Sequence, residues 1–436
     1  MQAEKQDAPS VHTTPGANAL GGAPALAGWR LMFRLFLPLS LGYFLSYFFR
    51  TINAVIVPQL TADFGLTASS IGLLTSVYFL AFAGMQIPIG LLVDRFGPRR
   101  VQSALLLVAA TGALGFAFGR TLPELIVARG LIGAGVAGSL MVSFTAFVLW
   151  LPPARVPGTV GLLMAFGGMG AFAAGAPTAQ FIATGGAWRD LFIALAVGAL
   201  AISAVVFIVL PEKSRNRAEP LGVLLSGLRR VFADGMFWRV APLTVAVLGS
   251  GFAIQGLWAG PWLMQVAHLD ASGVGIHLSA MAVALIFGAI ACGPILSVAQ
   301  RLGFSLLQAV GTMSVVFIVA VAGLVLQLTD LSLPLLAVIA FLINPISMSY
   351  VALTTRFDTT MAARVTTAIN ALVLLGSFLL QWIIGAIIGL WPPIAPGVYP
   401  AVAYQAGFGF VLCCLVVSWV WFVASLARSN RFPAKT

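Results

Sequence analysis

The stretch GLLVDRFGPRR, residues 90–100, decides the fold. A segment of about twenty apolar residues runs into it and a second one runs out of it. Two membrane-spanning helices joined by so short a turn must be antiparallel neighbours. The turn holds Asp94, Arg95, Arg99 and Arg100. Because short loops that keep arginine stay in the cytoplasm, this turn is predicted to lie on the cytoplasmic side.

The composition independently indicates a membrane protein. Of 436 residues, 60% are hydrophobic and only 8% are charged, which is too few charges to cover a soluble protein of this length. The formal net charge of +11 would suit a nucleic-acid-binding protein. The charges lie in short loops between apolar segments, however, so the positive-inside rule explains them better and no nucleic acid is expected. The three cysteines lie in apolar segments without metal-binding spacing, so neither a disulfide, a metal nor a cofactor is expected.

Twelve apolar segments are each long enough to cross a bilayer. They are residues 34–58, 70–93, 100–119, 123–150, 157–183, 190–211, 239–265, 275–299, 304–327, 333–355, 366–391 and 401–427. An even number of spans puts both chain ends on one side, and most of the 23 Lys and Arg residues lie on that side. Both termini are therefore predicted to be cytoplasmic, in a multi-pass protein of the inner (plasma) membrane.

A polar break after the sixth segment divides the chain. Within it, leucines recur near helical spacing over 221–234, which predicts an amphipathic helix on the cytoplasmic face. The predicted division is a disordered cytoplasmic tail at 1–29, a six-helix half at 30–211, a linker at 212–238, a second six-helix half at 239–427 and a cytoplasmic tail at 428–436.

The two halves repeat each other in sequence. QIPIGLLVDRFG at 86–97 aligns without gaps with CGPILSVAQRLG at 292–303, and a proline, an arginine and a glycine match. Asp94 corresponds to Gln300. An internal repeat of this kind predicts two related halves.

Residues 90–100 resemble the loop between the second and third helices of the major facilitator superfamily, whose pattern is G-x-L-x-D-R-x-G-R-[KR]. The matching residues are Gly90, Leu92, Asp94, Arg95, Gly97, Arg99 and Arg100, with Pro98 as an extra residue before the arginine pair. The resemblance covers about 30–427. It implies an all-α membrane protein with twelve transmembrane helices in two pseudo-symmetric six-helix halves, and a substrate site near the midplane. It also implies that Gly90, Asp94, Arg95, Gly97, Arg99 and Arg100 act in conformational switching, because this loop lies where helices shift as the halves rock.

Polar residues inside the spans are costly in lipid and are expected to face the protein interior. Tyr43, Tyr47 and Arg50 follow the spacing i, i+4, i+7 and so share one face of the first helix. Arg50 and Arg129 of the fourth helix are predicted at similar depths, roughly 6 and 7 Å outward of the middle of their spans. No carboxylate lies within any span to pair with Arg50, and an unpaired guanidinium favours an anion. Both arginines are therefore expected to contact a small anionic substrate.

The second half offers uncharged polar groups. In the superfamily the first, fourth, seventh and tenth helices line the cavity. Gln255 and Trp258 lie in the seventh span, Asn344 in the tenth and Gln381 in the eleventh. Amide and aromatic groups suit the body and hydroxyls of a small organic anion. Hydrogen bonding between helices explains each of these residues, taken singly, at least as well.

The stretch YFFRTINAVIVP at 47–58 resembles the first helix of the organic anion:cation symporter branch of the superfamily. Tyr47, Arg50 and Pro58 match. That branch carries an acid directly before the arginine, where this chain has Phe49. The resemblance implies anion binding, while the missing acid argues against the proton coupling that is usual in the branch.

A second acid of that branch, in the fourth helix, is also missing, since residues 135–137 are Gly-Val-Ala. Facilitated diffusion, exchange or sodium coupling is therefore expected, and proton coupling through Glu124 or Asp63 is the alternative. The predicted function is secondary active or facilitative transport of a small organic anion by a monomer.

A proton-coupled exporter of drugs or metabolites is the alternative within transporters, but the spans hold no acid to bind a cationic cargo. A non-transporting membrane sensor would need an appended domain or long loops. An enzyme would need a nucleophile, a metal or an acid–base pair, and none is found in the sequence.

Overall fold

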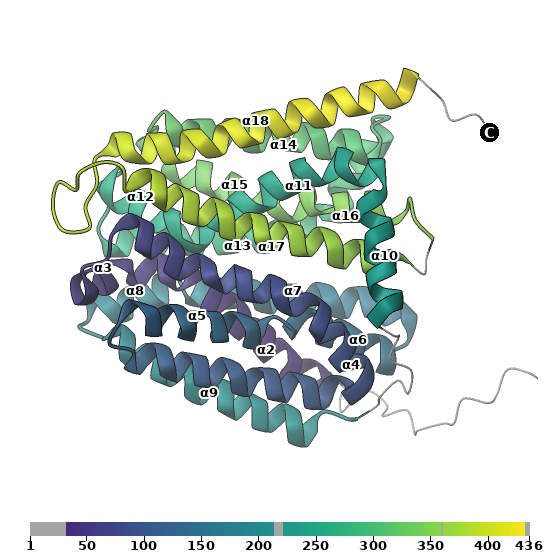
Figure 1. Cartoon of the computed structure of the whole chain (residues 1–436), viewed down its shortest axis with the longest axis horizontal. Helices are drawn as coiled ribbons and strands as arrows, with labels where there is room; N and C mark the ends of the chain where they lie inside the picture. The colour runs from purple at the N-terminus through teal and green to yellow at the C-terminus, as the bar shows by residue number, and fades with distance from the viewer. Residues whose placement is uncertain (1–31, 213–220, 359–360, 432–436) are drawn as a thin grey trace, which may run out of the picture.

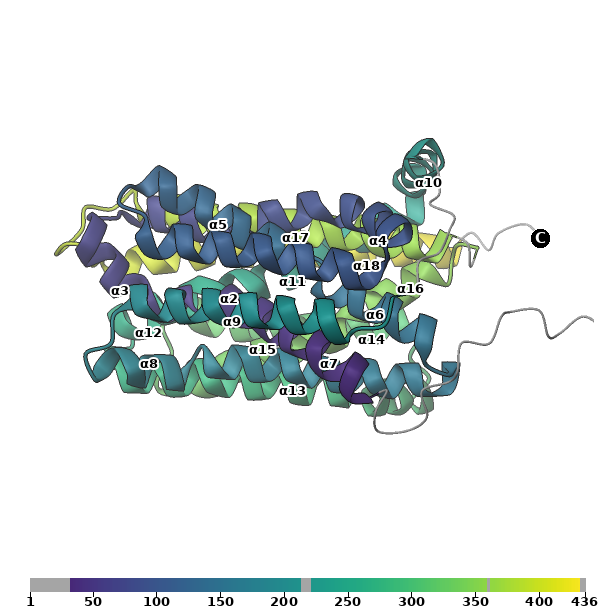
Figure 2. The same cartoon turned by 90° about the horizontal axis from the view of Figure 1, so that it is seen from below.

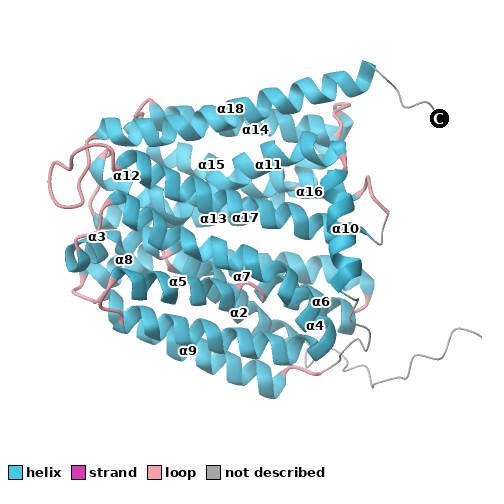
Figure 3. Ribbon diagram, in the orientation of Figure 1, coloured by secondary structure: helices cyan, strands magenta, loops and turns pink. Residues whose placement is uncertain are grey.

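The computed structural model describes residues 32–212, 221–358 and 361–431. The predicted tail at 1–29, part of the predicted linker and the end of the C-terminal tail lie outside the described residues. Within the described ranges the elements are helices, and no strand is present (Figure 3).

The helices fall into two sets on either side of the linker. The first set is η1 (Met32–Phe36), α2 (Leu37–Thr51), α3 (Asn53–Phe64), α4 (Ala68–Phe118), α5 (Leu122–Val136), α6 (Ser139–Trp150), η2 (Pro153–Arg155), α7 (Val156–Ala173), α8 (Ala176–Ala183) and α9 (Trp188–Val209). The second set is α10 (Leu221–Ala233), α11 (Gly235–Ala253), η3 (Ile254–Trp258), α12 (Ala259–Gln265), α13 (Ala271–Arg301), α14 (Leu306–Val325), η4 (Thr329–Leu331), α15 (Ser332–Ser347), α16 (Ser349–Thr354), α17 (Ala362–Ile388) and α18 (Ala401–Arg431).

These helices make up twelve spans. Among the described residues, ten helical runs are long and apolar enough to cross a membrane, and α2 with α3, bent by 49°, forms an eleventh. One of the ten is α4, whose 51 residues would measure roughly 76 Å, more than twice the hydrocarbon thickness of a bilayer. Gly97 interrupts α4 with a non-helical backbone, so α4 is two antiparallel spans. The predicted twelve-helix fold is therefore confirmed.

The turn inside α4 depends on a backbone that glycine alone adopts readily. Gly97 has φ 80° and ψ 163°, a region closed to residues with a Cβ. Gly303, its partner in the sequence repeat, also has φ 80°. The two halves therefore turn with a similar backbone at equivalent places, as the repeat predicts.

Replacing Gly97 with alanine should destabilise the protein by about 1–3 kcal/mol, because the new Cβ forces the strained backbone. The melting temperature of the purified protein measures the effect. Gly90→Ala is the matched control, since a Cβ there would meet only the Met141 sulfur, at 4.0 Å. Equal melting temperatures for the two variants would show that the positive φ at position 97 does not require a glycine.

The two sets of helices occupy different parts of the bundle. In Figure 1 the purple and blue helices before α10 lie in the lower part, and the green and yellow helices after it lie in the upper part. The helix α10 crosses one end of the bundle, as Figures 1 and 2 both show. We call this end the α10 face and the opposite end, which holds α3, α8 and α12, the α12 face.

Candidate substrate site

Arg50 lies in the last turn of α2, inside a group of aromatic rings. Its side chain is buried, with 7% exposure. The guanidinium carbon lies 4.4 Å from the ring centroid of Tyr47, 5.0 Å from that of Phe252 and 5.6 Å from that of Phe82. These rings come from both halves, because Phe252 belongs to α11. Cation–π attraction offsets part of the cost of burial, but a ring leaves the N–H groups without an acceptor in its plane.

No described carboxylate forms an ion pair with Arg50. Its Nε is buried without a hydrogen-bond partner. The ion pairs found among the described residues involve other arginines, namely Arg99, Arg100 and Arg189. Arg50 therefore keeps a positive charge that no described carboxylate neutralises. An anion is the kind of partner that a buried guanidinium binds best.

Two tyrosines extend the face of Arg50 toward the α10 face. The rings of Tyr43 and Tyr47 meet edge to face, with centroids 5.1 Å apart. The Tyr43 hydroxyl donates to the Met164 sulfur of α7 at 3.2 Å and lies 3.5 Å from the Tyr47 hydroxyl. The three residues lie together, as their spacing predicts.

Arg129 reaches the same level of the first span from α5 but contacts the backbone. The side chain is fully buried, and its Nη2 donates to the Phe49 carbonyl oxygen at 2.7 Å. The guanidinium carbon lies 5.0 Å from the ring centroid of Tyr78, whose hydroxyl donates to the Ser46 carbonyl oxygen at 2.9 Å. Arg129 and Tyr78 thus hold the segment that carries Arg50. The Nε and Nη1 of Arg129 are buried without a partner, so Arg129 positions this backbone while its expected substrate contact stays a prediction.

The four candidates of the second half divide into two kinds. Trp258 donates through Nε1 to the backbone carbonyl of Gln381 at 2.9 Å, and Asn344 donates to the Leu285 carbonyl at 2.8 Å, so both join helices. The side-chain amides of Gln255 and Gln381 are buried, and neither the nitrogen nor the oxygen of either amide has a partner. Buried amides without partners are rare and call for a ligand or a water molecule.

Toward the α12 face, the seventh span rests on the backbone of the first through two glycines one turn apart. A Cβ on Gly256 would lie 3.4 Å from the Arg50 carbonyl oxygen, and one on Gly260 would overlap the Ala54 carbonyl. We call Gly256 and Gly260, with the backbone of Arg50 and Ala54, the glycine seam. Small residues four apart are the usual means of bringing membrane helices close together.

Hydrogen bonds also join the halves. Asn370 of α17 donates to the Gln86 side-chain oxygen of α4 at 3.0 Å, one turn from Phe82. In the fifth and eighth spans, the Ala176 amide donates to the Ser279 hydroxyl at 2.7 Å. The Arg50 site is therefore bordered by contacts that must change if the halves rock.

The predicted switch motif lies at the α10 face and has a partner that the sequence did not suggest. Arg99 Nε lies 3.0 Å and Arg100 Nε 3.8 Å from a carboxylate oxygen of Glu212, just beyond α9. These are ion pairs by distance, without hydrogen-bond alignment. The Arg95 guanidinium lies over the ring of the next residue at 5.3 Å, and Asp94 is half-buried. The motif is thus tied to the end of the sixth span.

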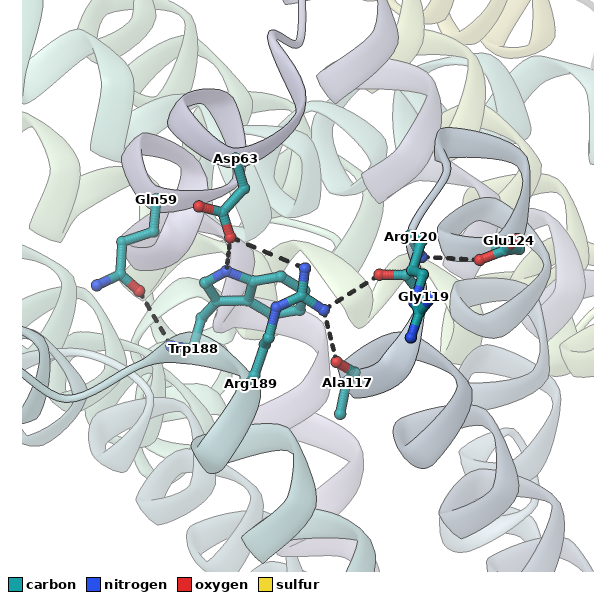
Figure 4. Close-up of polar contacts among 8 residues, drawn as sticks. All are labelled: Gln59, Asp63, Ala117, Gly119, Arg120, Glu124, Trp188 and Arg189. Carbon is teal, nitrogen blue, oxygen red and sulfur yellow. Dashed lines mark hydrogen bonds and ion pairs between the residues drawn. The ribbon is translucent and has the colours of Figure 1, made fainter.

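The two acids considered for proton coupling lie at the α12 face in fixed contacts (Figure 4). Asp63 accepts a hydrogen bond from Trp188 Nε1 at 2.9 Å and lies 4.0 Å from Arg189. Glu124 accepts from the Arg120 backbone amide at 2.7 Å. Neither carboxylate is in ion-pair contact with Arg50.

Several residues at the site escaped the sequence reasoning, which followed polar residues within each helix. The ring of Phe252 was missed because apolar residues were not considered. The sequence repeat could have revealed Phe252. The offset that aligns 86–97 with 292–303 makes Phe252 equivalent to Ser46, which lies close to the face of the first helix that carries Arg50. The pairing of Gln86 with Asn370 joins helices far apart in the chain, and no spacing rule predicts it.

Comparison with known proteins gives results for the family and for the fold. A family model described as Major Facilitator Superfamily matches residues 39–381. A solved structure, a bacterial homolog of the human lysosomal transporter Spinster in an inward-facing and unoccupied conformation, superposes with a TM-score of 0.75 at 18% identity. The match covers 94% of this chain and all of that chain, and at this identity it bears on the fold alone.

Two curated relatives are similar over part of their length. The probable sulfoacetate transporter SauU of Cupriavidus necator is 31% identical over 187 residues, 42% of this chain and 43% of the relative. The niacin transporter NiaP of Acinetobacter baylyi is 29% identical over 168 residues, 38% of each protein. The similarity thus spans less than half of each relative.

Proposed function

The chain belongs to the major facilitator superfamily of multi-pass membrane transporters, and from this premise we propose that it carries a small organic anion. It is a transporter and not an enzyme. The observation that carries the proposal is the buried guanidinium of Arg50, which no described carboxylate neutralises.

The site suits alternating access. Arg50 and Tyr47 belong to the first half, and the ring of Phe252 belongs to the second, so an anion bound to Arg50 would touch both. A ligand shifts the equilibrium between two conformations only if it binds one of them more tightly. A ligand that contacts both halves can do so, because its contacts change as the halves move. The Tyr47 hydroxyl would donate to the anion, and the Tyr43 hydroxyl would do so on turning away from Met164, while Arg129 would hold the backbone of the first span in place.

Further parts of the proposal rest on charge and similarity. The α10 face is the cytoplasmic face, since the arginine-rich switch motif lies there, and the protein acts as a monomer in the inner membrane. Sulfoacetate and niacin, which name two relatives, are both anions at neutral pH and support the class of substrate.

A binding screen with matched ligand pairs tests the proposal. Each small carboxylate, such as nicotinate, is paired with its uncharged amide, such as nicotinamide, and stabilisation of the purified protein is measured. We expect at least one carboxylate or sulfonate to raise the melting temperature while its neutral partner does not. Equal stabilisation by amides or by organic cations would contradict an anion site at Arg50.

Uptake should not be driven by a pH gradient. The two acids considered for proton coupling, Asp63 and Glu124, make fixed contacts at the α12 face, and neither is in ion-pair contact with Arg50. The measurement is uptake into vesicles at zero membrane potential, using a substrate whose ionisation is constant between about pH 6 and 8. Strong accumulation driven by the gradient would mean that a proton site has been overlooked.

A further inference from the structure

Three helices are interrupted at one level of the bundle. The first span breaks after α2, the fifth after α7, and the seventh changes from α11 to the π-helical η3. All three run from the α10 face toward the α12 face. Helices α2 and α7 end at this level, at the 49° bend of the first span and at the non-helical Gly175, whereas the seventh span continues through η3 with helical backbone. The repeat offset pairs Ile52, at the break in the first span, with Trp258, the last residue of η3. Interruptions at equivalent places of two halves are the mark of a binding site in membrane carriers.

A small enclosed cavity lies where the three interruptions meet. Its walls are Thr51, Ala171, Ala174, Gly175, Gln255 and Leu278. Its volume is about 10 Å³, which is the space of one water molecule or one small ion. The first half supplies four of these residues, and the second half supplies Gln255 and Leu278. The cavity therefore lies between the halves.

Each interrupted helix brings an oxygen to this cavity. Gln255 is 3% exposed, and its amide oxygen has no partner. The Thr51 hydroxyl donates to the Tyr47 carbonyl at 3.0 Å, which leaves its oxygen free to accept. The Gly175 amide bonds to the Phe172 carbonyl at 3.0 Å and not to that of Ala171. The carbonyl of Ala171 thus loses its helical partner at the cavity wall.

The electrostatics of the cavity favour a cation. A helix C-terminus carries a partial negative charge, and those of α2 and α7 lie here. Carbonyl, amide and hydroxyl oxygens are ligands for hard cations, and carriers use unwound carbonyls in this way. The described residues contain no cluster of His, Cys, Asp and Glu side chains that would suit a transition metal.

We propose that this cavity binds one sodium ion. The neighbouring charge of Arg50 opposes the ion while the substrate site is empty. An anion bound to Arg50 would remove that opposition, so ion and substrate should bind cooperatively. The cooperativity rests on the proposed anion transport, whereas sodium binding by itself does not.

Sodium binding can be tested without any substrate. The melting temperature of the purified protein is followed while choline chloride is replaced by sodium chloride at constant ionic strength, and binding of radioactive sodium is measured in parallel. Because Arg50 opposes the ion while the substrate site is empty, we expect a weak but saturable rise with sodium. No rise, together with no bound sodium, would mean that the cavity holds only water and would overturn the proposal.

Substitutions locate the ion. Gln255→Leu should weaken sodium binding about tenfold or more, as loss of a metal ligand does. Gln381→Leu is the matched control, because Gln381 is an equally buried amide without partners that does not line the cavity. If Gln255→Leu does not fold, Thr51→Val and Thr51→Ser are compared instead. Thr51→Val should weaken sodium binding and Thr51→Ser should not, since only serine keeps the hydroxyl. Unchanged sodium affinity in Gln255→Leu or in Thr51→Val would show that the ion binds elsewhere.

The outcome is separable from that of the proposed function. Nicotinate and sulfoacetate binding is measured in sodium-free buffer and again with saturating sodium. If sodium binds but no anion binds in either buffer, the sodium site is supported and the proposed substrate class is rejected. If an anion binds but sodium does not, the proposed substrate class is supported and the sodium site is rejected.

Discussion

Replacing Arg50 with alanine is expected to abolish binding of the anionic substrate. The guanidinium is a buried charge for which the described residues provide no acid, and each charge-assisted hydrogen bond that it makes to an anion is worth about 1.5–3 kcal/mol. Arg50→Lys should weaken binding strongly without abolishing it, because lysine keeps the charge but loses the planar fork. Calorimetry with the anion identified in the paired screen measures both effects.

The control for this experiment is Arg230→Ala. Arg230 lies on α10 and is exposed. Replacing it with alanine removes one positive charge, as Arg50→Ala does. Its substrate affinity should equal that of the unchanged protein. If Arg50→Ala folds and binds the anion with the same affinity as Arg230→Ala, the anion hypothesis fails at its central residue.

Gly260→Val should stop transport while leaving the protein folded. Any Cβ at this position overlaps the Ala54 carbonyl of the first span. The seventh and first spans would be forced apart at the α12 face, which disfavours every arrangement in which the glycine seam is closed. Hydrogen exchange of α3 and α12, measured by mass spectrometry, should increase as uptake falls.

Gly409→Val is the matched control for the seam. Gly409 is a helical glycine of the same half, on α18, with nothing within 4 Å of an added Cβ. It undergoes the same change of side chain without the overlap. Equal uptake and equal hydrogen exchange in the two variants would mean that the glycine seam plays no part in alternation.

Much of the fold could be predicted because its signals are local. Span length, the positive charges in the turns and the repeat of 86–97 at 292–303 each need only the sequence. The turn at Gly97 was located correctly for the same reason, since a glycine between two apolar segments marks a break. The interruptions within the first, fifth and seventh spans were not predicted. They replace few helical hydrogen bonds and leave the apolar pattern almost unchanged.

The candidate site was predictable in part. Tyr43, Tyr47 and Arg50 could be grouped because one helix carries all three. Arg129 was placed at the right level, but its bond to the Phe49 carbonyl depends on how the first and fourth spans pack, which spacing cannot reveal.

The glycine seam was visible in the sequence as two glycines four residues apart, Gly256 and Gly260. Its partner was not, because contacts between halves arise only after both have folded. The same limit applies to Trp258, whose acceptor lies on the eleventh span.

The bend in the first span has a consequence for how the chain enters the membrane. Only the pair α2 and α3 together, and neither helix alone, is long and apolar enough to cross, and Arg50 at their junction adds a cost of about 2.5–3.5 kcal/mol on insertion. The groups that hold this span come later in synthesis: Tyr78 binds the Ser46 carbonyl and Arg129 binds that of Phe49. This span is thus incomplete as a membrane segment when it is made, and it is held in place only once the fourth span has been made.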